Sequence, residues 1–430
     1  MAVTWRAVLL AAIGVPVVLV VPATGTVLIW AVLVVLACGL DAALAASPRR
    51  VGVQRAVPRS VRLGEPATDV VTLTNVGSRR LRALVRDAWP PSVDTQPARH
   101  EVDLPPGEAV RVRSVLRPSR RGDSIADLVT IRTVGPLRLA GRQASIDVPA
   151  RLRVLPAFAS RRHLPSRLAR LRELDGRAAV QVRGAGTEFD SLREYVIGDD
   201  VRSIDWRATA RRADVVVRTW RPERDRRVMI VLDTGRTAAV RVLDAPRIDA
   251  SIEATLLLAA LANHAGDRID VLAYDRRVRA RVAGMAGARL MPAVADQLSG
   301  VHAELVETDW PGVVAQVRER LSQRGLVVLL TALEPAAVEQ GLLGVVGGLT
   351  QHHQVVLASV LDPEVEALAR DRSDVTAVFD AAAAERAGLE RAAVAMRLRQ
   401  RGVELLEALP DDLAPRLADT YLALKAAGRL

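Results

Sequence analysis

The sequence has a single cysteine, Cys38, among 430 residues, and only 3% of its residues are aromatic. One cysteine excludes an intramolecular disulfide framework and the usual cysteine-rich zinc and iron–sulfur sites. Cys38 lies inside an apolar run, so we interpret it as a buried side chain and not as a reactive thiol. With so few aromatics, the core must be built mainly from Val, Leu and Ala. The chain is long enough for two or three domains.

Lysine is also scarce, because the basic residues are almost all arginine, and the formal net charge is +11. Such an excess is typical of nucleic-acid binding, of contact with an anionic membrane surface, or of a GC-rich genome that encodes Arg in place of Lys. No basic run is interleaved with aromatics, so we expect no nucleic-acid partner, while binding of anionic lipid stays open. A P-loop ATPase is excluded because the G-x-x-x-x-G-K-[ST] motif is missing.

Charge is absent from residues 7–46 except at Asp41, and one turn signal, at residues 22–25, interrupts this run. A helix needs about 20 residues to cross the hydrocarbon of a bilayer. Residues 26–46 meet that length, and residues 7–21 come close to it when the flanking Trp5 and Pro22 are included. A cleavable signal peptide would not be followed at once by a second apolar segment. We therefore predict a two-helix transmembrane hairpin with the lipid bilayer as a partner.

Arginines flank this hairpin on both sides, at Arg6 before it and at Arg49, Arg50 and Arg55 after it, whereas the connecting turn has none. The positive-inside rule then predicts a multi-pass protein of the cell membrane with both termini in the cytoplasm.

The remaining chain changes its pattern twice. Short β-branched runs occur at residues 70–74, 81–85, 109–116, 128–133 and 144–148, with turn residues between them, and they predict a small antiparallel sandwich. After residue 227, apolar strands alternate with amphipathic helices, which predicts a doubly wound parallel sheet. An antiparallel edge strand is expected at residues 278–282. The predicted domains are residues 1–48 (hairpin), 49–155 (β-sandwich), 156–226 (a polar segment) and 227–430 (α/β).

The polar segment contains the densest motif of the chain, G-x-G-x-E-F-x-x-L-R-x-Y-x-x-G-D-D-x-R-x-I-D-W, at residues 184–206. Its acidic and basic groups are suited to charge-assisted hydrogen bonds. This block resembles the domain of unknown function 58 (DUF 58) family, membrane proteins often encoded beside MoxR-type AAA+ ATPases. The resemblance implies the same layout for essentially the whole chain. The binding residues that we predict in it are Glu188, Arg193, Tyr195, Asp199, Asp200, Arg202, Asp205 and Trp206.

Two interpretations of this block stay open: a salt-bridged linker that docks on the α/β domain, which we favour, and a docking surface for a partner such as the ATPase. Catalysis is disfavoured, because no His or Cys nucleophile–base pair accompanies the motif.

The α/β half resembles a von Willebrand factor A domain, in which a D-x-S-x-S loop, a later Thr and a later Asp hold Mg²⁺. The resemblance places Asp233, Thr237 and Thr308 in such a site. Gly235 replaces the middle hydroxyl, and Ala332 stands where the second Asp is expected. We therefore expect a degenerate metal site without a cofactor, unless Asp309 or Glu334 substitutes.

These observations favour a membrane-anchored interaction or adaptor protein, not an enzyme, that works with a MoxR-type AAA+ ATPase on envelope or other protein complexes. The ATPase is implied by the family resemblance alone. The alternative is a metal-assisted hydrolase of cell-envelope metabolism, which needs a complete metal site or a nucleophile–base pair.

Overall fold

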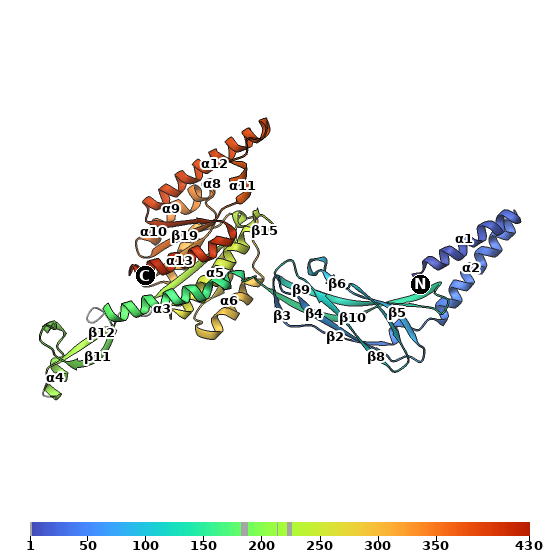
Figure 1. Cartoon of the computed structure of the whole chain (residues 1–430), viewed down its shortest axis with the longest axis horizontal. Helices are drawn as coiled ribbons and strands as arrows, with labels where there is room; N and C mark the ends of the chain where they lie inside the picture. Colours follow the sequence, from blue (N-terminus) through green and yellow to red (C-terminus); the bar gives the residue numbers. More distant parts are fainter. Residues whose placement is uncertain (1, 182–187, 213, 222–225) are drawn as a thin grey trace. The chain divides into compact units, whose positions relative to one another are not determined.

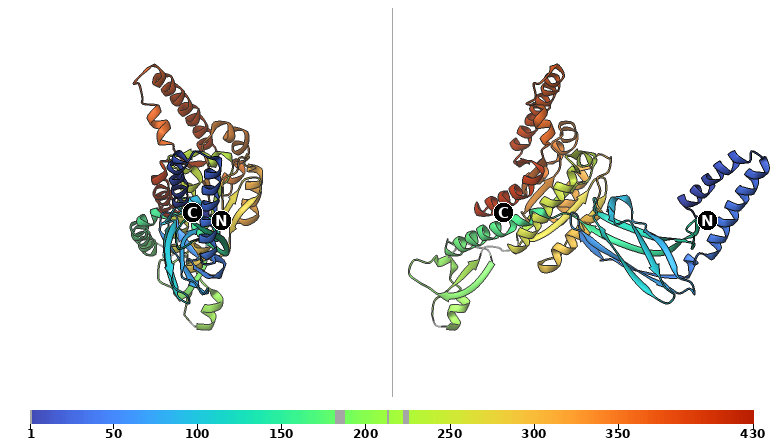
Figure 2. Two further views of the ribbon diagram at one scale, coloured as in Figure 1. Left: turned by 90° about the vertical axis from the view of Figure 1, so that its right-hand side faces the viewer. Right: turned by 45° about the vertical axis from the view of Figure 1, so that its right-hand side comes forward.

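The computed structural model describes residues 2–181, 188–212, 214–221 and 226–430; the side chains of residues 175–190, 212 and 219–221 lie outside the described part. The chain folds as two compact units, Met1–Ala157 and Phe158–Leu430. Figure 1 labels their elements, and Figures 1 and 2 colour them along the chain.

Two apolar helices begin the first unit, α1 (Trp5–Val20) and α2 (Thr24–Leu44), and they lie side by side (Figures 1 and 2). Gly14 permits this close approach, because a Cβ added there would lie 2.2 Å from Cδ1 of Trp30. The indole Nε1 of Trp30 also donates to the Leu10 carbonyl at 3.3 Å. Among the described residues, Thr24–Arg50 is the one helical stretch long and apolar enough to cross a membrane, whereas α1 is a shorter apolar helix.

Two β-sheets form the rest of the first unit, and all their strand pairs are antiparallel except β3 with β10. One sheet contains β1 (Ala2–Val3), β10 (Ala140–Leu155), β9 (Gly122–Val134), β5 (Leu81–Asp87) and β7 (Arg99–Leu104), in this order, with β3 (Ser60–Arg62) beside β10. The other contains β2 (Val51–Ala56), β4 (Ala67–Asn75), β8 (Ala109–Leu116) and β6 (Thr95–Gln96).

Alternation along the strands explains how the two sheets pack. In β4 every second residue is buried, as expected for a strand with one face in the core. Leu73 of β4 lies in the same hydrophobic cluster as Leu81 of β5 and Ile131 of β9. The two sheets therefore share one core, and the expectation of antiparallel β-structure in this region is confirmed.

The second unit is built on a sheet with the strand order β17-β16-β13-β18-β19-β20, parallel except for the edge strand β17. Its strands are β13 (Arg227–Asp233), β16 (Arg268–Tyr274), β17 (Val278–Val282), β18 (Leu326–Leu330), β19 (Gln354–Val360) and β20 (Val403–Ala408). All residues of β18 and β19 are buried, because helices cover both faces of the sheet. The predicted alternation of strands and helices is confirmed as a mixed parallel sheet with helices.

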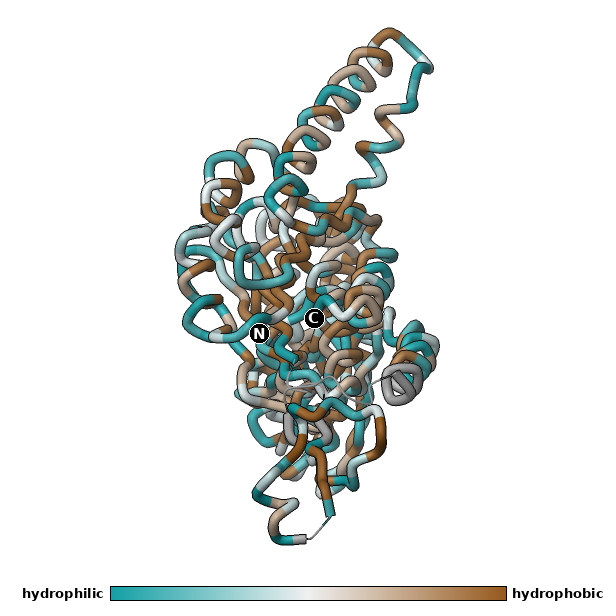
Figure 3. The backbone as a smooth tube through the Cα atoms, turned by 90° about the vertical axis from the view of Figure 1, so that its left-hand side faces the viewer, coloured by the Kyte–Doolittle hydropathy of each residue, from teal (hydrophilic) through white to brown (hydrophobic). Residues whose placement is uncertain are grey.

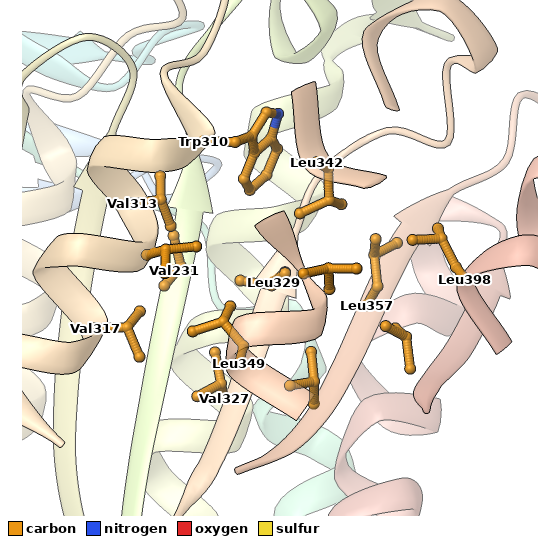
Figure 4. Packing of buried hydrophobic residues seen from close by; sticks show 14 of the residues in the cluster. Val231, Trp310, Val313, Val317, Val327, Leu329, Leu342, Leu349, Leu357 and Leu398 are labelled. Atoms are coloured by element: carbon orange, nitrogen blue, oxygen red, sulfur yellow. The ribbon is translucent and has the colours of Figure 1, made fainter. Parts of the chain in front are cut away.

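Helices pack on the two faces of this sheet in separate groups. On one face lie α5 (Arg247–His264) and α13 (Pro410–Ala426), and α3 (Leu164–Gln181) packs against both of these helices. The other face is covered by α7 (Trp310–Arg320) and by the carboxyl-terminal part of α12 (Val375–Gln400). Figure 4 shows Val313 and Val317 of α7 against the strand residues Val231 and Leu329. Along α12, hydrophilic and hydrophobic residues alternate (Figure 3).

The amphipathic pattern of residues 335–349 predicts a single helix, but the structure has a series of short turns there, namely α8 (Pro335–Ala337), a π-helical turn (Val338–Leu342), α9 (Leu343–Val345) and α10 (Gly347–Thr350). The indole ring of Trp310 packs against this segment at Gly341. A Cβ at Gly341 would lie 2.6 Å from Cδ1 of Trp310, so the segment needs a glycine where this ring packs against it.

Candidate functional site

The strand order defines a switch point in the second unit. From β13 the chain passes through α5 to β16 on one side, and it later returns to place β18 on the other side of β13. Crevices at the carboxyl ends of strands beside such a reversal are where doubly wound α/β proteins bind ligands. Asp233 ends β13 and Thr331 follows β18, so both residues lie at this edge.

The carboxylate of Asp233 is buried and accepts four hydrogen bonds. Thr308 Oγ1 donates to Oδ1 at 2.5 Å, and the amide of Gly235 donates to the same oxygen at 2.8 Å. Thr331 Oγ1 donates to Oδ2 at 2.5 Å, and Thr237 Oγ1 does so at 3.3 Å. The structure thus brings together the three predicted residues Asp233, Thr237 and Thr308, and it adds Thr331, which the sequence pattern did not single out.

These donors decide whether the site fits a divalent metal. Mg²⁺ needs an octahedral set of oxygen ligands rich in carboxylate charge, but here one carboxylate is surrounded by groups that donate hydrogen bonds to it. A hydroxyl side chain has no room at position 235, because a Cβ there would lie 2.3 Å from Thr308 Oγ1. Ala332 adds no oxygen and is itself buried. The residues present do not fit the metal.

The two possible substitutes do not complete the site either. Asp309 accepts a hydrogen bond from the Gly312 amide at the start of α7 and acts as its N-cap. Glu334 occupies the N-cap position of α8. Across the described residues, no three His, Cys, Asp or Glu side chains are grouped so that they could hold a metal ion.

A second buried carboxylate, Asp275, lies one strand away at the end of β16. It accepts Arg279 Nε at 2.5 Å and the hydroxyl of Thr234 at 3.1 Å. Burial would raise the pKa of Asp275, but the hydrogen bond from Arg279 and two backbone amides outweigh it and hold that pKa below its ordinary value. The sequence analysis did not single out Asp275, although an acidic residue at a strand end was the available signal.

Charge at the rim of this edge is mostly paired. Arg236, inside the first loop, forms an ion pair with Glu307, and Arg279 forms one with Glu304 at 3.2 Å. The positive charge that Arg236 brings to the loop is therefore balanced by Glu307. The polar side chains named above thus bond mainly to one another and to nearby backbone amides at this edge.

The motif block folds as a hairpin of its own. Strand β11 (Glu188–Glu194) pairs antiparallel with β12 (Val216–Arg221), and a short helix, α4 (Trp206–Arg212), lies between them in sequence. We call residues 188–221 the signature hairpin. Residues 184–187 of the motif lie outside the described residues, as does the side chain of Glu188, which begins β11.

The charged residues of the motif hold this hairpin together. Arg193 pairs with Asp199 at 2.5 Å, which lowers the pKa of that carboxyl. Asp200 accepts the Arg202 amide at 2.9 Å. Asp205 caps α4 by accepting the Ala208 amide at 3.0 Å.

Asp205 also pairs with a residue on the opposite strand, because Arg218 Nε donates to it at 2.8 Å. The backbone hydrogen bond from Ala208 and the Arg218 pair both lower the pKa of Asp205. These bonds close within the hairpin. The segment is thus salt-bridged within itself, while its docking on the α/β domain stays a prediction.

Apolar side chains, in contrast, are exposed on the signature hairpin. Ile197 is 96% exposed and Trp206 is 68% exposed, whereas Tyr195 is half-buried. We call the exposed apolar residues of the hairpin the hairpin tip; they are Val196, Ile197, Val201, Trp206 and Val215. The motif therefore uses its charges to build a scaffold and presents apolar residues on it.

Fold and site together define a mixed α/β protein whose doubly wound sheet carries a carboxylate–hydroxyl cluster at its switch point. Residues 191–403 match the family described as "Protein of unknown function DUF58", so the chain carries a DUF58 family domain that includes most of the signature hairpin and most of the parallel sheet.

The curated relatives are distant. The uncharacterized proteins Rv1480 of Mycobacterium tuberculosis and Mb1516 of Mycobacterium bovis are each 25% identical over 190 residues. That match covers 42% of this chain and 57% of either relative. The chain thus spans little more than half the length of the relatives it matches.

Solved structures overlap with about a quarter of the chain. A FixG-related protein from Vibrio parahaemolyticus is 11% identical, covers 24% of this chain and 96% of its own, and gives a TM-score of 0.18. The CARDB domain of the PF1109 protein from Pyrococcus furiosus is 18% identical, covers 24% and 93%, and gives 0.17. Likenesses this weak carry no argument about fold or function.

Proposed function

We propose that this chain is a membrane-anchored interaction protein that docks a partner on its signature hairpin, and that the partner is a MoxR-type AAA+ ATPase. The observation that carries the proposal is the exposed hairpin tip. Ile197 and Trp206 lie in solvent on a scaffold fixed by the motif's own ion pairs. Exposed apolar side chains of this kind, rimmed by polar groups, are typical of protein-binding surfaces. The identity of the ATPase rests on the family resemblance.

The anchor in this proposal is a two-helix hairpin with both ends on one side of the membrane. Strand β1 precedes α1 and pairs with β10 at Gly141, and the last turn of α2 bonds to the loop just before β10. The start of α1 and the end of α2 therefore lie at the same end of the first unit. If α2 crosses the membrane, α1 has to cross it as well, because both helices meet the β-structure on the same side. The arginines that follow α2 favour a cytoplasmic location for that side.

The remaining parts of the fold are proposed as follows. The two shared-core sheets of the first unit form a small β-sandwich. The parallel sheet is a von Willebrand factor A-like domain, supported by Asp233 at the end of its first strand with Thr237 and Thr308 bonded to it. Its role here is structural support for the docking hairpin. The collapsed carboxylate cluster does not favour the alternative of a metal-assisted hydrolase.

The test is affinity purification of the detergent-solubilised full chain with mass spectrometry of bound proteins. We choose Ile197→Ser because it removes exposed apolar surface without touching an ion pair of the hairpin. Leu389→Ser, at a 73% exposed leucine of α12, is the matched control. An AAA+ ATPase that binds the wild type and the control but is lost with Ile197→Ser supports the proposal.

Two outcomes count against it. If the ATPase is recovered undiminished with Ile197→Ser, the hairpin tip is not the docking surface. If no AAA+ ATPase is recovered with any of the three proteins, the proposed partner is wrong. Resistance of the hairpin to limited proteolysis, compared between wild type and Ile197→Ser, shows whether the scaffold itself is intact.

A further inference from the structure

The base of α2 is bonded to a loop of the β-structure. Asp41, in the last turn of the helix, is fully buried, and its carboxylate accepts the amides of Leu137 at 2.8 Å and of Leu139 at 2.7 Å. The amide of Ala140 donates to it at 3.0 Å. A carboxylate with three backbone donors fixes this loop firmly to the helix. We call residues 135–139 the Leu137 loop.

The start of α1 holds the same loop from its other side. Thr4 Oγ1 donates to the Arg138 carbonyl at 2.5 Å, and the Thr4 amide donates to the Leu139 carbonyl at 3.0 Å. Arg138 adopts a left-handed backbone conformation (φ 58°), which is uncommon for a residue other than glycine and is maintained here by its bonded neighbours. Two helices and a loop thus form one rigid corner of the first unit.

The length of α2 sets the depth of this corner in a membrane. Its 21 residues span about 31 Å, close to the roughly 30 Å of a bilayer's hydrocarbon, so the whole helix is needed to cross. Asp41 lies three residues before the end of the helix, or about 4.5 Å along its axis. The amide of Leu137, 2.8 Å from the Asp41 carboxylate, is therefore at the boundary between hydrocarbon and headgroups.

The side chains of the loop suit that depth. Leu137 is 59% exposed although it is apolar, and Arg138 beside it is exposed and basic. Trp5 follows Thr4 directly and is exposed as well, as expected for a residue of the interfacial aromatic belt. Arg79 and Arg142 donate to carbonyls of the last turn of α2, at 3.0 Å to Ala43 and 2.9 Å to Ala42, and add positive charge there.

We infer that the Leu137 loop is a third membrane contact, in which Leu137 inserts between lipids and Arg138 binds the phosphate of an anionic phospholipid. The inference rests on the membrane-anchored part of the proposed function. Bilayer lipid is the occupant because the loop is bonded to the last turn of α2, an apolar helix long enough to cross a membrane, whose Leu36 and Leu40 are 62% and 60% exposed. The charge of Arg138 complements anionic headgroups. The loop orients the first unit on the membrane in addition to the two helices.

The test measures the depth of spin labels in vesicles of phosphatidylcholine and phosphatidylglycerol. Single cysteines are introduced into the Cys38→Ala full chain as Leu137→Cys, Ile125→Cys and Leu36→Cys. Ile125 is the matched control, since it is 54% exposed on the same strand, β9, that precedes the loop, and lies about 30 Å along it from Val134. Accessibility to oxygen relative to a water-soluble nickel complex reports the depth of each label.

We expect the Leu137 label to lie at the phosphate level or deeper and the Ile125 label to lie in water. A Leu137 label as water-accessible as the Ile125 label overturns the inference, as does one shielded from both reagents, which indicates coverage by protein. The Leu36 label separates the two proposals. If it is deep while Leu137 lies in water, only the loop inference fails; if it too lies in water, membrane anchoring itself fails.

The lipid preference is tested on the same full chain by comparing retention of phosphatidylglycerol and phosphatidylcholine. Arg138→Gln is expected to lower the preference for the anionic lipid about fivefold at low ionic strength, the effect of one basic residue at the surface. Arg132→Gln is the control, at an exposed arginine that lies before the loop in β9 and bonds to Gln143. It is expected to change the lipid preference less. Equal preference in wild type and Arg138→Gln overturns the assignment of Arg138 to lipid phosphate.

Discussion

Thr331 Oγ1 donates a hydrogen bond to Asp233 Oδ2 at 2.5 Å and so joins the ends of two adjacent parallel strands, β13 and β18. Doubly wound proteins leave a crevice at this position when they bind a ligand there. Here three threonine hydroxyls and a backbone amide fill the space around the carboxylate. The cluster joins the two strands at the switch point, and we expect it to stabilise the second unit.

Thr331→Val should therefore destabilise the second unit. The variant keeps the shape of the side chain but leaves the buried Asp233 carboxylate without one donor, which is expected to lower the free energy of unfolding by about 1–3 kcal/mol. Urea unfolding followed by pulse proteolysis measures the change. Thr420→Val, at a half-buried helical threonine whose hydroxyl bonds to the Arg416 carbonyl, serves as the control and should cost less.

Mg²⁺ should not stabilise the second unit. A ligand that binds only the folded state raises the melting temperature by mass action, and the donor set around Asp233 does not fit this ion. We expect the same melting temperature with millimolar Mg²⁺ as with a chelator. A rise with Mg²⁺ that disappears in Asp233→Asn would contradict the fit argued above.

The stability of the first unit should depend on the pH through Asp69. Burial, and then the hydrogen bond with Asp87, raise the pKa of Asp69 from 3.8 to about 7, although Trp89 and Arg55 oppose this. Arg55 is buried between the two carboxylates and lies 3.6 Å from Asp69. Between pH 4 and 7 the folded state therefore holds a proton that the unfolded chain has released, so stability falls as the pH rises through this window.

Pulse proteolysis in urea at pH 5 and pH 8 measures this effect, and the unit should resist more urea at pH 5. In Asp69→Asn, which keeps an acceptor for Trp89 Nε1, the difference should shrink. Asp123→Asn is the control, because the hydrogen bond from Arg151 lowers the pKa of Asp123 and its stabilising effect is lost at acidic pH instead. A wild-type unit that is more stable at pH 8 would contradict the assignment.

Tyr421→Phe should loosen the carboxyl-terminal helix. The hydroxyl of Tyr421 donates to the buried Asp267 at 2.5 Å, and Lys425 donates to the other carboxylate oxygen at 3.2 Å. Loss of one donor to a buried carboxylate is expected to reduce the free energy of unfolding by about 1–3 kcal/mol. Hydrogen exchange in α13 measures it, with Tyr195→Phe of the signature hairpin as the control.

The packing of α1 on α2 should depend on Gly14. Because a Cβ at this position would collide with Trp30, Gly14→Leu is expected to separate the helices and to destabilise the pair by about 1–3 kcal/mol. Gly39→Leu is the matched control, since a Cβ there meets no atom within 4 Å. Thermal unfolding of the detergent-solubilised chain compares the two; equal melting temperatures would contradict the close approach of the helices.

The central strands of the parallel sheet could be predicted from the sequence. Residues 326–330 and 355–358 are continuously apolar because both faces of a central parallel strand are buried, so their pattern identifies them without a structure. Strand β7 was missed, because Val102 and Leu104 are the only apolar residues in Arg99–Leu104 and its pairing with β5 is what makes it a strand. The close packing of Gly341 against Trp310 likewise joins segments that are distant in the chain.

By itself the sequence determined the apolar helices, the order of elements, the signature motif and the resemblance to a family. The resemblance to a von Willebrand factor A domain also placed Asp233, Thr237 and Thr308 as candidates for one site. Only the tertiary structure decided what these residues do. Hydrogen bonding and steric contact join residues far apart in the chain, such as Thr331 with Asp233 and Leu137 with Asp41. No local pattern encodes these distances, because they depend on how the strands and helices pack.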